Sequence, residues 1–388
     1  MQIFKAQFLW ILYGFIFLFT ACRNGNDPIQ RTSSFISESA ITELYHNQLI
    51  GIADSIMQLP ALALVNSALH QDSDTPGTYV SLACYWWPNP TTQDGLPYIR
   101  IDGNVNPETR SDASHLPILI NMARRIEYLA NAYLLTGSEK YAGKALEQLY
   151  TWFINEETKM LPHLENAQMV KGVNTGRSYG IIDGWWLVRV AESIRPLTVS
   201  AHWNHELETG LISWFSEFLN WLIDSEFGQT EIRSGNNHGT WYDVQVVAYA
   251  MLTGRTDFAE RHLQEISTVR LRRQLSPSGR QKLEMRRTRP LHYAIYNLAG
   301  QMKLAQYART LDVDYGNKAT FFSSGLERSV LYLIHTMNGA DVTALTDPHD
   351  ETNTDLLYLN ILDTACKLFE HDEICTEKTR YLSEQITD

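Results

Sequence analysis

Two short segments of the sequence carry side chains that can stabilise a negative charge and move a proton. The first, Ser234–Tyr242, reads Ser-Gly-Asn-Asn-His-Gly-Thr-Trp-Tyr and places Asn237 beside His238 at an expected turn before a helix. The second begins at Arg289 and reaches Tyr296 seven residues later, about two turns further along if it is helical. Amide, imidazole and guanidinium groups can neutralise a carboxylate as charge delocalises into it. A tyrosine, with an ordinary pKa of about 10, is a strong base once it is ionised.

Each of these residues also has a purely structural explanation. An Asn-Asn-His turn can serve only to cap a helix, Arg289 can pair with a surface carboxylate, and Tyr296 can pack within a helix. Taken singly, the structural explanation is the stronger one for each residue. Taken together with the aromatic loop and the basic segment described next, the residues favour a catalytic site.

The segment from Tyr79 to Asn106 is rich in aromatic residues, proline, glycine and asparagine, and we expect it to be a long ordered loop. A long loop inside a compact domain is more often functional than idle. Its adjacent tryptophans, Trp86 and Trp87, offer a flat apolar platform for a sugar ring. The alternative is that one or both of them fill the core.

Positive charge is concentrated in one segment of an otherwise acidic chain. The formal net charge is −12, which argues against nucleic acid as a partner. The segment from Arg270 to Arg289 nevertheless holds eight arginine and lysine residues against one acidic residue, Glu284. Such a focus can attract a polyanion and steer it into a cleft. A solvated β-hairpin around Ser276–Gly279, paired with acidic helices elsewhere, is the simpler alternative.

Several of these motifs resemble one known family. The Asn-Asn-His turn followed by Trp241 resembles the signature of the alginate lyase superfamily of polysaccharide lyases. The segment Arg289–Tyr296 resembles that family's Arg-x-Leu-x-Tyr-x-x-Tyr motif, although Pro290 follows the arginine here. The closest likeness is to polysaccharide lyase family 38, carried by Trp86–Pro90, Asp94–Tyr98 and Asn174–Arg177. The resemblance implies an (α/α) toroid and elimination across the C4–O4 bond of a 1,4-linked uronate, without an obligatory metal or cofactor.

The resemblance also implies a role for each site residue. Tyr296 is the matched residue for proton transfer. Asn174, Asn237 and His238 would hydrogen-bond the substrate carboxylate, and Arg289 would add a positive charge or lower the pKa of a nearby phenol. Further substrate contacts are expected from Trp86, Trp87, Arg177, Asn236, Trp241, Tyr242, His292 and Tyr293.

The configuration of the sugar decides how the proton could move. Mannuronate and glucuronate carry H5 and O4 on the same face, so Tyr296 alone could remove the proton and return it to O4. Guluronate needs an anti arrangement, with His238 as the base and Tyr296 as the acid. Two roles of His238, base or carboxylate neutraliser, therefore stay open.

Helical periodicity dominates the chain and favours an all-α fold over a parallel α/β sheet. Breaks such as Thr136-Gly137 and Thr253-Gly254 separate successive stretches, as in stacked helical hairpins. We therefore expect an incomplete (α/α) toroid with long active-site loops. The expected helices cover residues 41–57, 116–135, 140–153, 181–195, 207–223, 243–252, 258–269, 292–311, 325–337, 355–369 and 376–386.

The amino terminus predicts export. Lys5 precedes an apolar run from Phe8 to Phe19, which is too short for a membrane span of about 20 residues and leads through small residues to Cys22. This pattern is typical of a lipoprotein signal, with an ordinary signal peptide as the alternative. We expect a signal at residues 1–21, a polar tether at 22–37 and one toroid domain at 38–388.

Export has two further consequences. We expect a periplasmic or outer-membrane lipoprotein of a Gram-negative bacterium, touching the membrane only through a lipid at Cys22. An oxidising compartment permits a disulfide between Cys366 and Cys375, although two buried thiols are equally compatible with the sequence.

The favoured function is β-elimination in an acidic polysaccharide, with mannuronate-rich alginate ahead of glucuronan. A glycoside hydrolase with twin carboxylates and a non-catalytic glycan-binding lipoprotein are the rivals. No metal site is expected: the histidines are scattered, and the acidic stretch from Asp341 to Asp355 lacks the ligand spacing of a calcium loop and reads as solvated.

Overall fold

The structure is a computed structural model that describes residues 38–70, 76–313, 321–338 and 354–387. The expected signal at residues 1–21, the lipid-bearing Cys22 and the tether at 22–37 lie outside these residues. Residues 341–353 of the acidic stretch that was expected to be solvated also lie outside them.

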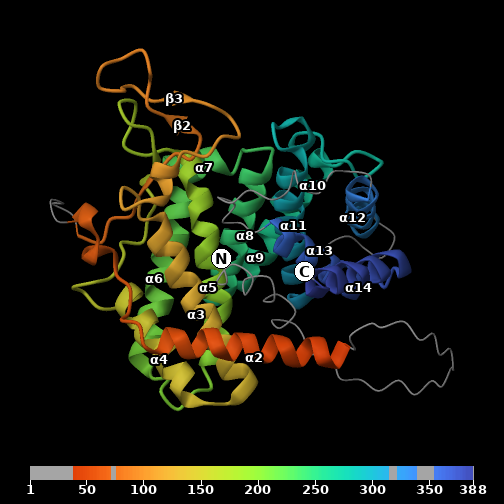
Figure 1. Cartoon of the computed structure of the whole chain (residues 1–388), viewed down its shortest axis with the longest axis horizontal. Helices are drawn as coiled ribbons and strands as arrows, with labels where there is room; N and C mark the ends of the chain where they lie inside the picture. Colours follow the sequence, from red (N-terminus) through yellow and green to blue (C-terminus); the bar gives the residue numbers. More distant parts are fainter. Residues whose placement is uncertain (1–37, 71–75, 314–320, 339–353, 388) are drawn as a thin grey trace.

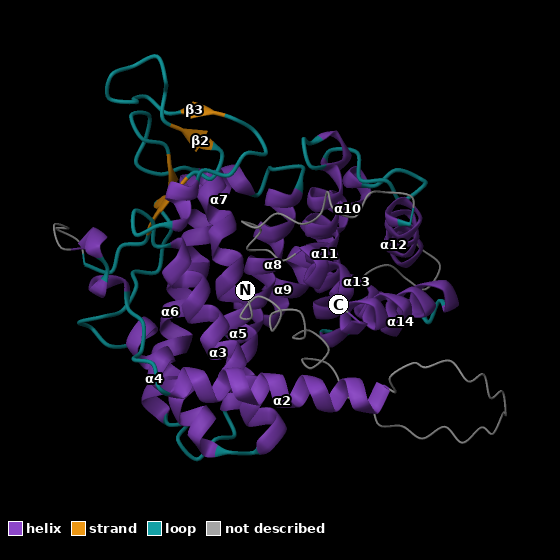
Figure 2. Cartoon of the chain, in the orientation of Figure 1, coloured by secondary structure: helices purple, strands orange, loops and turns teal. Residues whose placement is uncertain are grey.

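Helices account for most of the described residues, and every segment predicted to be helical is so (Figure 2). The α-helices are α2 (Glu38–Met57), α3 (Leu116–Thr136), α4 (Glu139–Phe153), α5 (Trp185–Leu197), α6 (His205–Asp224), α7 (Glu226–Glu231), α8 (Asn237–Leu252), α9 (Thr256–His262), α10 (Thr268–Gln274), α11 (Pro290–Thr310), α12 (Phe321–Met337), α13 (Thr354–Phe369) and α14 (Asp372–Thr387). Short 3-10 helices are η3 (Leu64–Asn66), η4 (Ala68–His70), η5 (Pro107–Arg110), η6 (Ser178–Gly184) and η8 (Glu284–Arg286), and η7 (Leu263–Ser267) is a π-helix.

Several boundaries differ from the expectation; for example, residues 181–184 belong to the 3-10 helix η6, and α5 begins only at Trp185. Helix α7 was not predicted, η7 interrupts the helix expected at 258–269, and α8 begins at Asn237, six residues earlier than expected. Most of α8 is buried on every face. A helix buried all round has no one-sided apolar pattern, so periodicity cannot mark where it starts.

The helices pack in antiparallel succession around one core, which confirms the predicted incomplete (α/α) toroid. Helix α3 packs on α4 and α5, α5 on α8, α8 on α11, α11 on α13, and α13 on α14 (Figure 1). One hydrophobic cluster runs from Leu49 in α2 to Leu382 in α14. Gly137 ends α3 in the left-handed conformation, with φ of 65°, and so allows the sharp reversal into α4.

The predicted loop from Tyr79 to Asn106 is ordered and contains short strands. Strand β1 (Val80–Leu82) pairs in parallel with β4 (Asn166–Met169), and β2 (Trp86–Trp87) pairs antiparallel with β3 (Ile99–Arg100). The β2–β3 hairpin projects beyond the ends of the helices (Figure 1). It therefore forms part of the rim at this end of the toroid.

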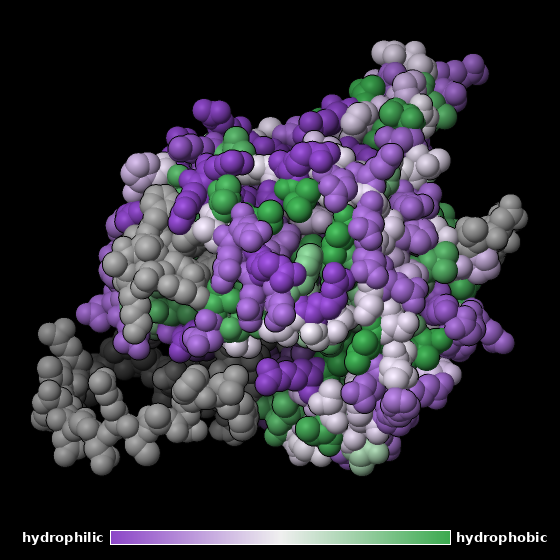
Figure 3. Space-filling model, turned by 180° about the vertical axis from the view of Figure 1, so that it is seen from behind, coloured by the Kyte–Doolittle hydropathy of each residue, from purple (hydrophilic) through white to green (hydrophobic). Residues whose placement is uncertain are grey.

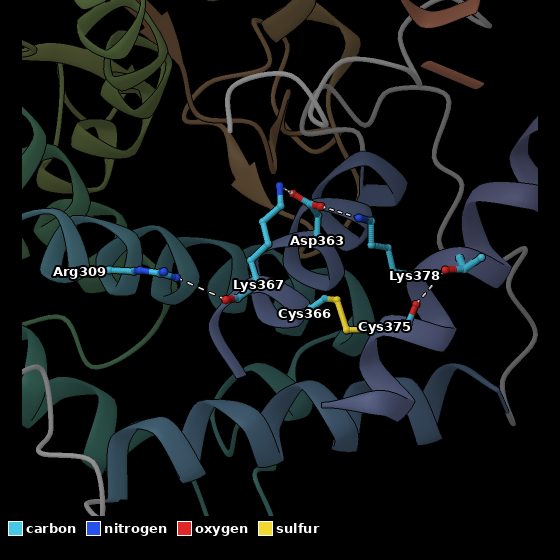
Figure 4. The surroundings of a disulfide bond; sticks show 7 residues. Arg309, Asp363, Cys366, Lys367, Cys375 and Lys378 are labelled. Atoms are coloured by element: carbon cyan, nitrogen blue, oxygen red, sulfur yellow. Dashed lines mark hydrogen bonds and ion pairs between the residues drawn. A yellow bond between two sulfur atoms is a disulfide. The ribbon is translucent and has the colours of Figure 1, made fainter. Parts of the chain in front are cut away.

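A disulfide joins Cys366 in α13 to Cys375 in α14, with a Cα–Cα distance of 5.0 Å (Figure 4). This resolves the choice that the sequence left open in favour of the bridge. Beside it, Asp363 forms ion pairs with Lys367 at 2.6 Å and Lys378 at 2.8 Å. The bridge and these ion pairs tie the last helical hairpin together.

The outer surface is a mosaic of hydrophilic and hydrophobic side chains, as the view from behind shows (Figure 3). None of the helices in the described residues has both the length and the apolar character that crossing a membrane requires.

Candidate active site

The first turn of α8 holds His238 between a buried carboxylate and an exposed phenol ring. Asn236 caps the helix, and its side chain accepts a hydrogen bond from the backbone N–H of His238 at 3.2 Å. The Nδ1 atom of His238 lies 2.6 Å from Oε1 of Glu231, which is buried at the end of α7. The imidazole meets the ring of Tyr179 edge-on, with 4.9 Å between centroids. Because Glu231 occupies Nδ1, Nε2 is the ring nitrogen left to face a substrate.

Asn237 is fixed by a second buried carboxylate. Its backbone N–H donates to Oε1 of Glu284, and its side-chain Nδ2 donates to Oε2 of the same residue, both at 2.8 Å. Both residues are buried. Burial raises the pKa of Glu284, and the two hydrogen bonds from Asn237 oppose that rise.

Tyr296 lies on α11, where aromatic rings from three helices position it. Its ring stacks on Trp241 of α8 at 5.1 Å between centroids and on His292 at 6.4 Å, and it meets Trp185 of α5 edge-on. The indole Nε1 of Trp241 also donates to the backbone carbonyl of Tyr296 at 3.1 Å. The contact between α8 and α11 thus brings the proton-transfer candidate to the helix that carries Asn237 and His238.

Arg289 stands immediately before α11. The helix begins at Pro290, which fills the first helical position, where its missing N–H costs nothing. Arg289 is therefore half-buried at the entrance of the helix rather than on it. The sequence left this local geometry open because of Pro290.

A pair of tyrosines joins the aromatic loop to α11. The hydroxyl of Tyr293 hydrogen-bonds that of Tyr85, and it accepts a second bond from Arg287 at 2.8 Å. The Arg287 guanidinium also lies over the ring of Tyr293, 3.7 Å from its centroid. Arg287 pairs with Asp102 of the loop at 3.1 Å. Burial raises the pKa of Tyr293 to about 12, so this phenol stays protonated at neutral pH.

Arg177 lies between the predicted tryptophan platform and the catalytic candidates. Its guanidinium lies 5.9 Å from the ring centroid of Trp86 and 5.1 Å from that of Tyr179. One of its nitrogens donates to Gln168 at 3.0 Å. Trp87 donates from Nε1 to the backbone carbonyl of Asn104 at 2.9 Å, which fixes the second indole on the hairpin. Both tryptophans are half-buried, so each keeps some surface for a ligand.

Four predicted substrate contacts are buried: Trp241, Tyr242, His292 and Tyr293, the last of which is 6% exposed. Trp241 and Tyr242 are each 1% exposed, and the Tyr242 hydroxyl donates to the carbonyl of Leu222. Trp241 stacks on Tyr296 and Tyr242 bonds the backbone of α6, so both side chains support the site from behind. His292 is buried as well, with Nδ1 2.8 Å from the Thr354 hydroxyl.

Asn174 is exposed and lies in a tight turn. Its side-chain oxygen accepts the backbone N–H of Val170 at 3.0 Å, and its own N–H donates to the carbonyl of Val170 at 3.1 Å. The amide oxygen is thus used locally, which leaves the nitrogen of the side chain as the donor for a carboxylate.

The basic segment is not uniform: polyanion contact was expected of the group and not of each residue, and Arg270 lies inside the molecule. This arginine is buried and bonds Asp243 through Nε at 2.8 Å. It also donates to the backbone carbonyls of Ile232 and Ser234, just before the Asn-Asn-His turn. Around Ser276–Gly279 a turn does form, closed by a bridge between residues 275 and 281, as the simpler alternative expected.

Sequence reasoning missed Glu231 and Glu284 as partners of the site. Glu284 had one detectable signal, since it is the only acid in the basic segment. Glu231 had none, because a glutamate at a helix end ordinarily faces water.

The arrangement can bind a carboxylate, stabilise charge on it and move a proton. The groups that suit this chemistry are the amide of Asn237 and the imidazole of His238 on α8, the guanidinium of Arg289 before α11, and the phenol of Tyr296 on α11. Among the described residues, no group of three or more histidine, cysteine, aspartate or glutamate side chains is placed to hold a metal ion.

Comparisons with known proteins agree with this geometry. The sequence profile of the family described as alginate lyase matches residues 65–341. The crystal structure of an alginate lyase from Bacteroides ovatus is 30% identical, with a TM-score of 0.79, covering 88% of this chain and 91% of that one.

Two structures of alginate lyase A1-III are similar in fold alone. The enzyme from Sphingomonas species A1 is 14% identical with a TM-score of 0.52, covering 84% of this chain and 88% of that one. A histidine-to-alanine variant of A1-III in complex with a tetrasaccharide is 14% identical, with a TM-score of 0.53 and the same coverage. No curated protein matches the chain.

Proposed function

Because this chain belongs to the alginate lyase family and is a polysaccharide lyase, we propose that it cleaves a 1,4-linked polyuronate, with mannuronate-rich alginate as the favoured substrate. The cleavage is a β-elimination. A base removes H5, the electron pair forms the C4–C5 double bond, and the C4–O4 bond breaks as O4 takes up a proton. The products are a new non-reducing end with an unsaturated uronate and a new reducing end.

The observation that carries this proposal is the junction of α8 and α11. Stacking between Trp241 and Tyr296 sets the phenol beside the helix whose first residues are Asn237 and His238. In a mannuronate, H5 and O4 lie on one face. Ionised Tyr296 takes H5 and then returns a proton to O4, acting as base and acid in turn.

Carboxylate neutralisation falls to the residues around that phenol. In the elimination, charge from C5 delocalises into the C6 carboxylate, so donors aimed there lower the barrier. The second Nδ2–H of Asn237, Nε2 of His238 when protonated, and the guanidinium of Arg289 take this role. Asn174 adds a donor from its exposed turn.

Sugar residues away from the cleaved bond bind along the aromatic loop. Trp86 and Trp87 offer ring faces to the sugar, and Arg177 and the exposed arginines of the basic segment offer charge to the carboxylates. This placement lets an acidic protein hold an acidic polymer.

Two related substrates remain within the same proposal. Glucuronan has the same configuration as mannuronan at C4 and C5 and fits the same Tyr296 path. Guluronate requires anti elimination with His238 as base, and the bond between Nδ1 and Glu231 leaves Nε2 for that task.

The test is ultraviolet absorbance of the unsaturated uronate while signal-free protein acts separately on mannuronan, guluronan and glucuronan. Absorbance should rise fastest with mannuronan, and Tyr296→Phe should slow that rise by roughly 10²–10⁴-fold, the usual contribution of general acid–base catalysis. New reducing ends without absorbance would indicate hydrolysis and refute the elimination. Binding of oligosaccharide that survives Tyr296→Phe with no turnover in wild type would favour the glycan-binding lipoprotein.

The proposal includes a place for the enzyme outside the cytoplasm. Residues 1–21 would be removed, a lipid on Cys22 would hold the chain at the membrane, and residues 22–37 would tether the domain in the periplasm or at the outer membrane of a Gram-negative bacterium. Expression of the full chain should give a membrane-bound protein that Cys22→Ser releases into the soluble periplasmic fraction. Equal partition of both proteins would refute the anchor.

A further inference from the structure

We propose that Glu284 is a positioning residue that fixes the side-chain amide of Asn237 and so sets the donor presented to the substrate carboxylate. The proposal rests on the function proposed above, in which Asn237 neutralises the uronate. The Glu284 side chain is buried, and both of its oxygens accept hydrogen bonds from Asn237.

The geometry defines which amide atom faces the glutamate. Both oxygens of Glu284 are used by Asn237, one by the backbone N–H and one by Nδ2, each at 2.8 Å. An ionised carboxylate only accepts hydrogen bonds, so the amide must turn its nitrogen, and not its oxygen, toward Glu284. One Nδ2 hydrogen is thereby bound, and the direction of the second is fixed with it.

This second N–H is the one that Asn237 can offer to a substrate. An unrestrained asparagine amide can rotate by half a turn and exchange its oxygen and nitrogen. With the oxygen in place of the N–H, the side chain would repel a carboxylate rather than bind it. Glu284 therefore holds the Asn237 amide with its N–H, and not its oxygen, available to the carboxylate before the substrate binds. A donor fixed in advance in this way is electrostatically preorganised.

The backbone of the turn is held by other residues, which separates the role of Glu284 from a general structural one. Gln274 of α10 donates to the carbonyls of Gly235 and Asn236, each at 3.1 Å. Arg270 holds the carbonyls of Ile232 and Ser234. Removing the charge of Glu284 thus leaves the backbone of the turn anchored, and the hydrogen bonds that change are those to Asn237.

Glu284→Gln is the sharpest substitution, because it keeps the size of the side chain. Its oxygen can still accept the backbone N–H, while its NH₂ group then faces the amide of Asn237. Two NH₂ groups repel, so Asn237 should turn its oxygen inward. The number of hydrogen bonds is preserved and the orientation is reversed, which favours retention of the fold.

The first readout does not depend on activity. Protein with ¹⁵N-labelled asparagine should give a side-chain amide signal that disappears in Asn237→Ala. In the wild type one of its protons should be shifted downfield by the bond to a carboxylate, and Glu284→Gln should remove that shift. An unchanged amide signal in Glu284→Gln would overturn the proposal, whether or not the chain is a lyase.

The second readout is the rate of elimination in a double-mutant cycle. Glu284→Gln should lower kcat by about 10–100-fold with little change in KM, the scale of one hydrogen bond to a charged group. In the Asn237→Ala background the same change should have almost no effect, because its target is gone. Multiplicative effects, or full activity in Glu284→Gln, would show that Glu284 does not act through Asn237.

Two further measurements keep the outcomes distinct. Glu265→Gln, an exposed glutamate outside the site, should retain wild-type rates and serves as the matched control. A wild-type protein that forms no unsaturated uronate refutes the proposed function, while the amide signal still decides whether Glu284 orients Asn237.

Discussion

The Asn-Asn-His turn and the β2–β3 hairpin border the same site but are built in opposite ways. In the turn, buried Glu231 and Glu284 hold the side chains of His238 and Asn237, and α10 binds the backbone. The hairpin is largely exposed and is held by its short strand pair, the ion pairs of Asp102 and backbone hydrogen bonds such as that from Tyr98 to the carbonyl of Lys171. Groups that act on reacting atoms need fixed positions, whereas a surface that follows a polymer gains from adjustment. The difference predicts that damage to the turn lowers stability and kcat, while damage to the hairpin changes KM.

The largest expected effect comes from breaking the support of the turn. Arg270→Met removes one of the two partners of Asp243, a fully buried carboxylate that also contacts His262, and frees two backbone carbonyls. Loss of one member of a buried ion pair costs about 3–5 kcal/mol. Denaturant unfolding should register this loss, whereas Arg273→Met, an exposed arginine of the same segment, should stay within about 0.5 kcal/mol of wild type.

The stability loss in Arg270→Met should depend on pH, and the pKa of Asp243 determines in which direction. Burial alone would raise the pKa of Asp243, but Arg270 and His262 outweigh it and hold the pKa below its usual range. In the wild type, the stability that this carboxylate contributes is present above about pH 4 and is lost as pH falls through its depressed pKa. In Arg270→Met the burial is opposed by His262 only, so the pKa of Asp243 should rise. The difference in unfolding free energy between the wild type and Arg270→Met should therefore be largest near pH 7 and become smaller toward pH 4. A difference that does not change with pH would contradict a stabilising ion pair between Arg270 and Asp243.

The two regions also differ in how far the sequence could predict them. Helices with one apolar face were found with accurate cores, and so was the ordered aromatic loop, since both have local patterns. The start of α8 was missed because that helix is buried on every side. The motif residues Asn237, His238 and Tyr296 stand out by type and spacing. The residues that hold Asn237 and His238 do not stand out, because Glu284 and Glu231 have the sequence pattern of ordinary surface acids and are buried only in the folded protein.

For Arg270 and Trp241 the sequence patterns predicted contact with substrate, whereas both side chains are buried in the structure. A run of arginines suggests a solvated, polyanion-binding face, yet its first member lies inside the molecule against Asp243. Trp241 belongs to a motif that predicts sugar contact, and it instead carries Tyr296 on its ring. Packing between distant parts of the chain decides which residues of a motif are exposed to substrate, and a local sequence pattern does not show this packing.

An intermediate effect is expected on the hairpin side. Trp87→Ala removes an indole that is fixed by Asn104 but contributes nothing to the reacting atoms. KM for mannuronan should rise roughly tenfold, equivalent to about 1.4 kcal/mol of uniform binding, with kcat nearly unchanged. Steady-state kinetics by ultraviolet absorbance would measure both constants. Leu96→Ala, another apolar side chain of the hairpin, is the control, and a fall in kcat without a change in KM would place Trp87 in the chemistry instead.

The smallest effect should come from releasing the hairpin itself. Asp102 pairs with Arg100 at 2.6 Å and Arg287 at 3.1 Å, and it also accepts the Thr288 hydroxyl at 3.2 Å. These groups are partly exposed, so Asp102→Asn should cost only about 0.2–1 kcal/mol of unfolding free energy, and less as salt screens the pairs. Its clearer sign should be kinetic: the hairpin should be cleaved faster by a protease while kcat stays the same. Because the turn has its own buried anchors, a loss of kcat comparable to that of Glu284→Gln would mean that the two regions are coupled after all.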